Sequence, residues 1–90
     1  MSERGFLLHG RVQGVGFRWW TRKTAERLGV VGTVKNLPDG SVEVMARAER
    51  EALERFADKL RKGPAMARVE SVEDVTCRLP DGIDAFRIEH

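Results

Sequence analysis

Hydrophobic and polar residues alternate at the start of the chain and then change to a helical spacing. Between Phe6 and Val12 the alternation has a period of two, which is typical of a strand with one buried face. From Phe17 to Leu28 the apolar and small residues recur every three or four positions, which predicts an amphipathic helix. Gly29 follows at once, and glycine there favours a helix end because it adopts positive φ without strain.

Two further strands are predicted on either side of a turn. The segment Val30–Leu37 is rich in β-branched residues, and a new alternation runs over Val42–Ala46. Between them, the residues of Pro38–Gly40 favour a tight turn, because proline presets φ, aspartate bonds the nearby backbone and glycine accepts positive φ. We therefore expect a hairpin. In its second strand, the side chains expected to face water are Ser41, Glu43 and Met45.

A second helix is predicted in the middle of the chain. Gly63-Pro64 ends it, because proline cannot continue a helix. Its apolar face is formed by residues spaced three and four apart, namely Leu53, Phe56, Ala57 and Leu60.

The remaining residues predict two more strands and complete the order of elements. Val69–Leu79 is expected to be the last long strand, with a bend or bulge between Val72 and Val75, where the alternation breaks. Pro80–Gly82 predicts a turn, and Ala85–Ile88 predicts a short final strand. The resulting order is that of a ferredoxin-like βαββαβ fold with a short C-terminal strand. This fold hosts many unrelated activities, so function has to be argued from a site.

Composition and charge exclude several classes of protein. The 90 residues suffice for one domain, which we assign to residues 1–90. Basic and acidic residues number 16 and 14, and both signs alternate along Glu49–Arg55, which is typical of a solvated helix face rather than a nucleic-acid patch. No apolar run approaches the ~20 residues of a membrane span and no signal peptide is present, so a cytoplasmic location is expected. The single cysteine, Cys77, predicts neither an internal disulfide nor a usual structural zinc site.

The segment between the first strand and the first helix, Gly10–Arg18, carries the candidate chemistry. Gly14 and Gly16 let the backbone turn tightly and direct its N–H groups inward. The helix N-terminus adds unpaired N–H donors and a partial positive charge, and Arg18 can extend over the same place, so a cradle for phosphate is predicted. It is not a dinucleotide fingerprint, because Trp19 stands where glycine is needed, nor a Walker loop. A glycine-rich turn that binds nothing is the alternative.

Several motifs together resemble the acylphosphatase family. They are Gly10-Arg11-Val12-Gln13-Gly14-Val15-Gly16-Phe17-Arg18, Gly32-x-Val34-x-Asn36, Asp39-Gly40-x-Val42, Gly63-Pro64 and Ala67-x-Val69. The resemblance covers the chain from about Gly5 to His90. It implies an enzyme that hydrolyses acyl phosphates to a carboxylate and inorganic phosphate. It also implies an α/β (α+β) sandwich, with two helices on one face of an antiparallel-rich sheet.

The same resemblance implies the residues of the site. The family's catalytic arginine and asparagine match Arg18 and Asn36. Its phosphate loop, which acts through backbone N–H groups, matches Gln13, Gly14, Val15, Gly16, Phe17 and Arg18. No metal and no organic cofactor is implied. The expected partner is a small-molecule acyl phosphate, with inorganic phosphate as product. Binding to nucleic acid or to a membrane is not expected. The protein is expected to be a monomer.

The residue chemistry is compatible with that activity. A carboxylate leaving group, whose acid has a pKa of about 4, departs without a strong general acid. Phosphoryl transfer can then be catalysed mainly by positioning and electrostatic stabilisation. Arg18 and the loop can hold the phosphoryl oxygens, and Asn36 can orient a water through its amide oxygen. A nucleophilic mechanism is not favoured, because neither His9 nor His90 is expected beside the loop and Cys77 is expected to be a small core residue.

Other interpretations stay open at this point. Asn36 could simply cap the strand end and bond the turn, and Arg18 could be a solvated or ion-paired helix residue. Trp19 is expected to be exposed, where it could shape the mouth of the site, contact the acyl group of a substrate or have no role. Trp20 is expected to pack, and Thr21 either assists the loop or bonds its own helix. An RNA-binding module is disfavoured because the third strand lacks exposed aromatics. A domain of a larger carbamoyl-phosphate-handling enzyme is disfavoured because no linker follows. A regulatory domain stays an alternative, and it would bind a small ligand without turnover.

Overall fold

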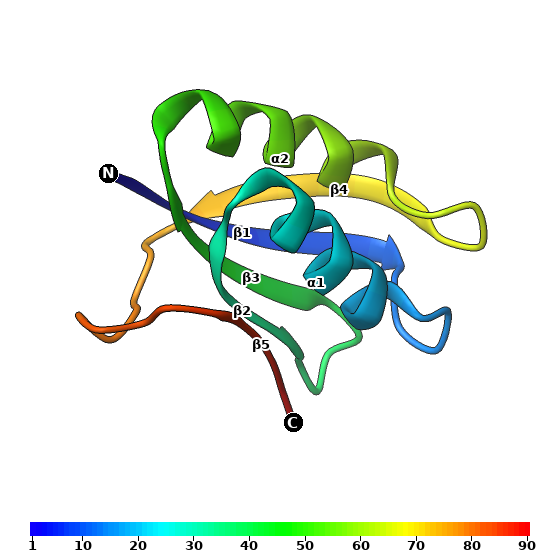
Figure 1. The fold of residues 1–90 in the computed structure, drawn as a ribbon. Coiled ribbons are helices and arrows are strands. Elements are labelled where there is room, and N and C mark those ends of the chain that lie inside the picture. Colours follow the sequence, from blue (N-terminus) through cyan, green and yellow to red (C-terminus); the bar gives the residue numbers. More distant parts are fainter.

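Five strands form a single sheet, and two helices pack on one of its faces. The protein is described by a computed structural model that covers all residues 1–90. Its elements are β1 (Ser2–Arg11), α1 (Phe17–Leu28), β2 (Val31–Asn36), β3 (Val42–Ala48), α2 (Arg50–Lys62), β4 (Arg68–Val75) and β5 (Phe86–Glu89). Figure 1 shows α1 and α2 side by side across the sheet. The predicted fold class is confirmed.

The sheet brings the ends of three strands to the same edge. Its strand order is β4-β1-β3-β2-β5. Both β1 and β2 pair antiparallel with β3, and β5 pairs parallel with β2. The strands β1, β2 and β5 therefore run in the same direction. As a consequence, the loop after β1, the last residue of β2 and the end of the chain all meet at one edge of the sheet.

The core lies between the sheet and the two helices. Three aromatic rings form its centre, with Phe56 of α2 packed edge-on against Phe6 and Phe86 at centroid distances of 6.3 and 6.0 Å. The four apolar residues that predicted α2 are all buried, and burying each large side chain stabilises the fold by about 1.5–3 kcal/mol. Between two paired strands of the sheet, a Cβ at Gly32 would lie 1.8 Å from the Met45 carbonyl oxygen. Only glycine therefore allows β2 to approach β3 this closely.

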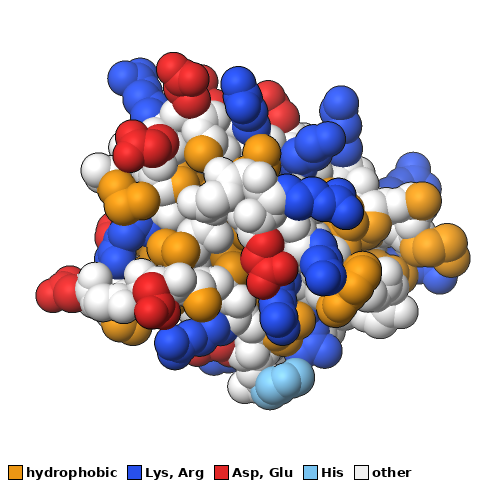
Figure 2. Space-filling model, in the orientation of Figure 1, with side chains coloured by type: hydrophobic (Ala, Val, Ile, Leu, Met, Phe, Trp, Pro, Cys, Tyr) orange, Lys and Arg blue, Asp and Glu red, His pale blue; other side chains and the backbone are white.

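The exposed faces of the helices carry charges of both signs, as the alternation in the sequence predicts. Figure 2 shows basic and acidic side chains interspersed over the side of the molecule that bears the helices. Three ion pairs lie within the helices at a spacing of three or four residues: Arg22–Glu26, Arg50–Glu54 and Arg61–Asp58. Neither helix is long and apolar enough to cross a membrane.

The predictions for the last long strand are wrong in two respects. The strand β4 ends at Val75, and Cys77 lies in the connection to β5. The register shift lies at Glu70 rather than between Val72 and Val75, because Ser71 pairs with His9 while Val69 pairs with Gly10. The reason is Gly10, where a Cβ would lie 2.2 Å from the Arg68 carbonyl oxygen, so that glycine permits a close approach at this point.

Other boundaries and one face of β3 also differ from expectation. The strand β1 begins at Ser2 rather than Phe6, because the first residues pair with the end of β3. Met45 and Ser41 are buried rather than facing water, with Met45 only 7% exposed. The connection between β4 and β5 covers part of this face, held there by Arg47, which donates hydrogen bonds to the carbonyls of Pro80 (3.1 Å) and Asp81 (3.2 Å).

Candidate active site

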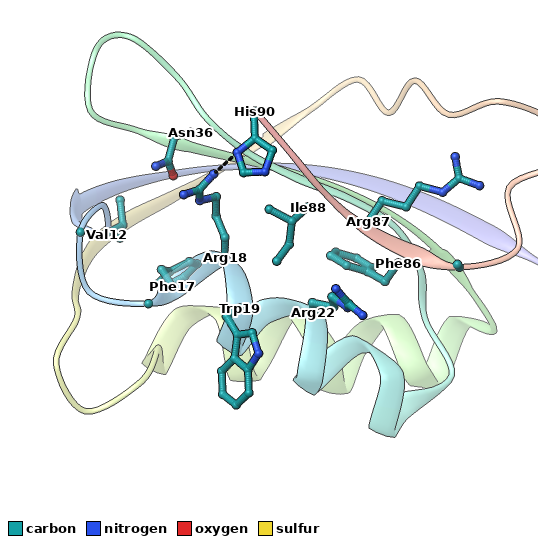
Figure 3. A pocket seen from close by; sticks show the side chains of 13 residues that line it. Val12, Phe17, Arg18, Trp19, Arg22, Asn36, Phe86, Arg87, Ile88 and His90 are labelled. Carbon is teal, nitrogen blue, oxygen red and sulfur yellow. Dashed lines mark hydrogen bonds between the residues drawn. The ribbon is translucent and has the colours of Figure 1, made fainter.

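A cavity of about 760 Å³ lies at the sheet edge where β1, β2 and β5 end. Its walls come from the loop after β1, the start of α1, the last residue of β2 and the strand β5 with the residue that follows it (Figure 3). Of the predicted site residues, it brings together Gly14, Gly16, Phe17, Arg18 and Asn36. No aspartate or glutamate lines it, so its electrostatic character favours an anion.

The N-terminus of α1 presents unpaired backbone donors to this cavity. Gly16, with a left-handed φ of 73°, is the N-cap, and it makes no side-chain cap. The first hydrogen bond of the helix runs from the Trp20 N–H to the Gly16 carbonyl at 3.0 Å, so the three N–H groups before Trp20 have no helical acceptor. The first turn holds no acidic residue that could compensate the positive end of the helix dipole. The loop therefore has the donors and the charge that a phosphate requires.

Arg18 adds a fixed positive charge to the same end of the cavity. Its Nη1 lies 3.1 Å from His90 Nδ1, and Figure 3 shows the two side chains pointing toward one another from α1 and the end of the chain. Because a guanidinium can only donate, Nδ1 of His90 is the acceptor in this contact. No carboxylate pairs with Arg18, so its charge is available to a bound anion. The alternative of an ion-paired helix arginine is not supported.

Asn36 faces this cationic end from β2. It lies beside Arg18 in Figure 3. Its Oδ1 is buried and accepts no hydrogen bond from the protein. A buried acceptor without a partner costs about 1–3 kcal/mol, and no group of the chain satisfies the Asn36 Oδ1.

The alternative in which Asn36 only ties down the turn is not supported by its contacts. Asp39 holds the turn instead, because its Oδ1 accepts hydrogen bonds from the Ser41 N–H at 2.9 Å and from the Ser41 hydroxyl at 2.5 Å. These bonds to Ser41 lower the pKa of the Asp39 carboxyl below its ordinary value of 3.8.

Two predicted loop residues do not line the cavity. Val15 packs partly against the core. Gln13 points its amide away from the cavity, to the carbonyls of Leu37 and Ser41 in the β2–β3 turn. Any contact of these residues with a phosphate would have to be made by the backbone, which is the role that the sequence assigned to the loop.

The structure corrects one expectation about the histidines. His9 does not line the cavity, and its Nε2 is 3.5 Å from a Glu73 carboxylate oxygen. His90 instead lines the cavity beside Arg18, although 72 residues separate the two in the sequence. The cause is the parallel pairing of β5 with β2, which no local pattern in the sequence could reveal.

The residues next to the loop resolve the remaining alternatives. Trp19 is 61% exposed and lines the cavity, whereas Trp20 packs on Phe17 with a centroid distance of 5.4 Å. Thr21 is buried, and its hydroxyl donates to the Phe17 carbonyl at 2.8 Å. Thr21 therefore bonds its own helix rather than the loop, which is the second of the two roles considered for it.

Comparison with known proteins shows which family the chain belongs to. The family model of acylphosphatase matches residues 4–88. The chain belongs to the acylphosphatase family. An acylphosphatase of Koribacter versatilis is 44% identical over 88 residues, covering 98% of this chain and 80% of that one. The crystal structure of an acylphosphatase from Bacillus subtilis superposes with a TM-score of 0.92 at 32% identity and covers both chains fully.

The acylphosphatase fold also occurs inside a longer protein. HypF from T. kodakarensis matches all of this chain with a TM-score of 0.87 at 28% identity, but the match covers 12% of HypF. The chain is thus a member of a family of hydrolases whose fold is found both alone and within a larger protein.

Proposed function

We propose that this protein hydrolyses the carboxyl–phosphate bond of acyl phosphates by direct attack of water. The observation that carries the proposal is the meeting of three features in one cavity free of acidic side chains. These are the unpaired N–H groups of α1, the guanidinium of Arg18 and the unpartnered Oδ1 of Asn36. Membership of the acylphosphatase family supports it independently.

In this mechanism the phosphoryl group occupies the cradle. The unpaired N–H groups at the start of α1, including those of Phe17 and Arg18, donate to its oxygens, and the Arg18 guanidinium neutralises charge that builds up on them in the transition state. Such donors are already in position before the reaction begins. They are effective because no free energy is spent on reorienting them as charge develops.

Asn36 orients the attacking water. Its Oδ1 accepts a hydrogen bond from the water, so that the water oxygen faces phosphorus opposite the leaving group. The new bond from oxygen to phosphorus forms as the bond from phosphorus to the carboxyl oxygen breaks. The electron pair leaves with the carboxylate, and the protons of water pass to the phosphate product and to solvent. The carboxylate needs no general acid, since it is a weak base.

Hydrolysis of benzoyl phosphate, followed by ultraviolet absorbance in the presence of a chelator, tests the proposal. We expect turnover by the wild-type protein. We expect Asn36→Ala to lower kcat by roughly 100-fold, because the water is no longer aimed. Calorimetric titration with inorganic phosphate should give a dissociation constant within about threefold of wild type, because the cradle and Arg18 are untouched.

Two outcomes would contradict the proposal. If the folded wild-type protein binds phosphate without turnover, it is a binding domain. If Asn36→Ala retains almost full activity, the role given to Asn36 is wrong. That residues 1–90 form one domain, that the protein is a monomer and that it is cytoplasmic remain predictions; limited proteolysis, gel filtration and cell fractionation test them.

A further inference from the structure

The side chain of Gln13 joins the two halves of the candidate site. Its Nε2 donates one hydrogen bond to the Leu37 carbonyl at 2.9 Å and another to the Ser41 carbonyl at 2.8 Å. Gln13 immediately precedes the cradle glycines, and Leu37 immediately follows Asn36. These two are the only hydrogen bonds between the loop after β1 and the turn after β2.

The turn does not need Gln13 to satisfy its own backbone. The Leu37 N–H donates to the Ser41 carbonyl at 2.9 Å, and the Gly40 N–H donates to the Leu37 carbonyl at 3.1 Å. Gln13 thus supplies a second hydrogen bond to two carbonyls that already accept one each. The turn is complete without these two bonds. Their contribution is therefore to connect the turn after β2 to the loop after β1.

We infer that Gln13 is a positioning residue that sets the separation between the anion cradle and Asn36. The inference rests on the proposed function, in which the cradle holds phosphorus and Asn36 aims the water at it. The cradle is rich in glycine, and its strand, β1, is separated from β2 by β3. A displacement of about 1 Å between reacting groups can lower a rate by about 100-fold. The Gln13 amide fixes this spacing directly, at the point where the two parts approach.

The chemistry of the side chain explains why an amide suits this position. Its NH₂ group has two donors, which is the number that two neighbouring carbonyls can accept. An ionised glutamate would offer only acceptors and would face the two carbonyls repulsively. A methionine has similar length but no donor. These differences make Gln13→Met and Gln13→Glu informative variants.

A double-mutant cycle tests whether Gln13 acts through Asn36. The kcat for benzoyl phosphate is measured for wild type, Gln13→Met, Asn36→Ala and the double variant. We expect Gln13→Met alone to lower kcat by roughly 10- to 100-fold, with the dissociation constant of inorganic phosphate within about threefold of wild type. In the Asn36→Ala background the same change should cost less than about threefold, since the group that it positions is already absent. Equal losses in both backgrounds would overturn the inference.

A pH profile of Gln13→Glu gives a second test that does not depend on the low activity of Asn36→Ala. Protonation of the introduced carboxyl restores one donor to the turn carbonyls. The ratio of its kcat to that of wild type should therefore rise as the pH falls from 7 to about 4, near the ordinary pKa of glutamate. A ratio that stays flat over this range would contradict a positioning role for the donor.

Arg47→Met provides the matched control. Arg47 also ties a loop to the sheet through two carbonyl acceptors, but at the opposite end of β3 from the cavity. We expect Arg47→Met to lower the thermal unfolding temperature and leave kcat unchanged. If Arg47→Met loses as much kcat as Gln13→Met, then breaking any hydrogen bonds between a loop and the sheet lowers the activity. That result would overturn the inference. Absence of turnover by the wild-type protein would instead refute the proposed function.

Discussion

The two helices lie on the same face of the sheet, yet only one of their N-termini belongs to a site. The helix α1 begins after Gly16, whose φ is 73°, and its first turn carries no acid. The helix α2 begins after Glu49, whose φ is −57°, and its first turn carries Glu51. The start of α1 faces the cavity, whereas α2 follows β3 at the opposite edge of the sheet.

This difference indicates what the proposed anion site adds to a helix end. Both ends have unpaired N–H groups and the positive end of a helix dipole. In α2 the charge of Glu51 compensates the dipole locally, so little attraction is left for another anion. In α1 no such charge is present, and Arg18 and Asn36 add a cation and an acceptor that point to the same place. The dipole alone is therefore not the site.

The largest expected effect comes from removing the cation that distinguishes α1. Arg18→Ala should weaken phosphate binding and lower kcat for benzoyl phosphate by about 100- to 1000-fold, the range typical of losing one donor to a developing charge. Arg50→Ala, in the first turn of α2, should change neither quantity, because its side chain is 87% exposed and far from the cavity. Full phosphate affinity in Arg18→Ala would show that the backbone alone binds the anion.

A smaller effect should follow from making α1 resemble α2 electrostatically. Trp19→Glu introduces a carboxylate into the first turn and should raise the phosphate dissociation constant by about 2- to 5-fold at low salt, as expected from a charge beside a helix dipole. The neutral variant Trp19→Gln should show no such increase, and added salt should reduce the difference. The same titration of Glu51→Gln should give the wild-type value. Equal affinities for Trp19→Glu and Trp19→Gln would refute the electrostatic explanation.

The smallest effect on phosphate is expected from the N-cap residues themselves. Gly16→Ala should cost about 1 kcal/mol of unfolding free energy, because alanine is strained at a left-handed φ although the space around the position is open. Phosphate affinity should change by less than about twofold, since the strain destabilises the fold rather than the bound anion. Glu49→Ala, at an ordinary φ, should change stability by less than about 0.5 kcal/mol. Urea unfolding measures the stability of the variants, and calorimetry measures their affinity for phosphate. Equal losses of stability in Gly16→Ala and Glu49→Ala would contradict the distinction between the two N-caps.

Local patterns in the sequence predicted the parts of this comparison that depend on neighbouring residues. The helix over Phe17–Leu28 was predicted with the bounds that the structure has, because helical spacing and the closing Gly29 are both local signals. The apolar face of α2 was predicted for the same reason. The position of Gly14 and Gly16 directly before a helix could be predicted because turn-forming glycines and a helix start are both local signals.

Features that depend on contacts between distant segments were predicted poorly. The shift at Glu70 depends on Gly10 in another strand, and the burial of Met45 depends on the connection that follows β4. Gln13 is predicted to act through its backbone in the phosphate loop, and nothing in the sequence indicates that its side-chain amide binds carbonyls 24 and 28 residues away. The residues around His90 in the sequence give no indication that it lies beside the loop.

The sequence by itself predicted the order of the elements and the glycines that precede α1, because each rests on spacing and turn preferences within a few residues. Only the tertiary structure decided which side chains share the cavity. The strand order β4-β1-β3-β2-β5 makes β1, β2 and β5 run in one direction, and so places Arg18, Asn36 and His90 at one edge. The physical reason is that strand pairing is made by hydrogen bonds between segments far apart in the chain, whose register no local pattern specifies.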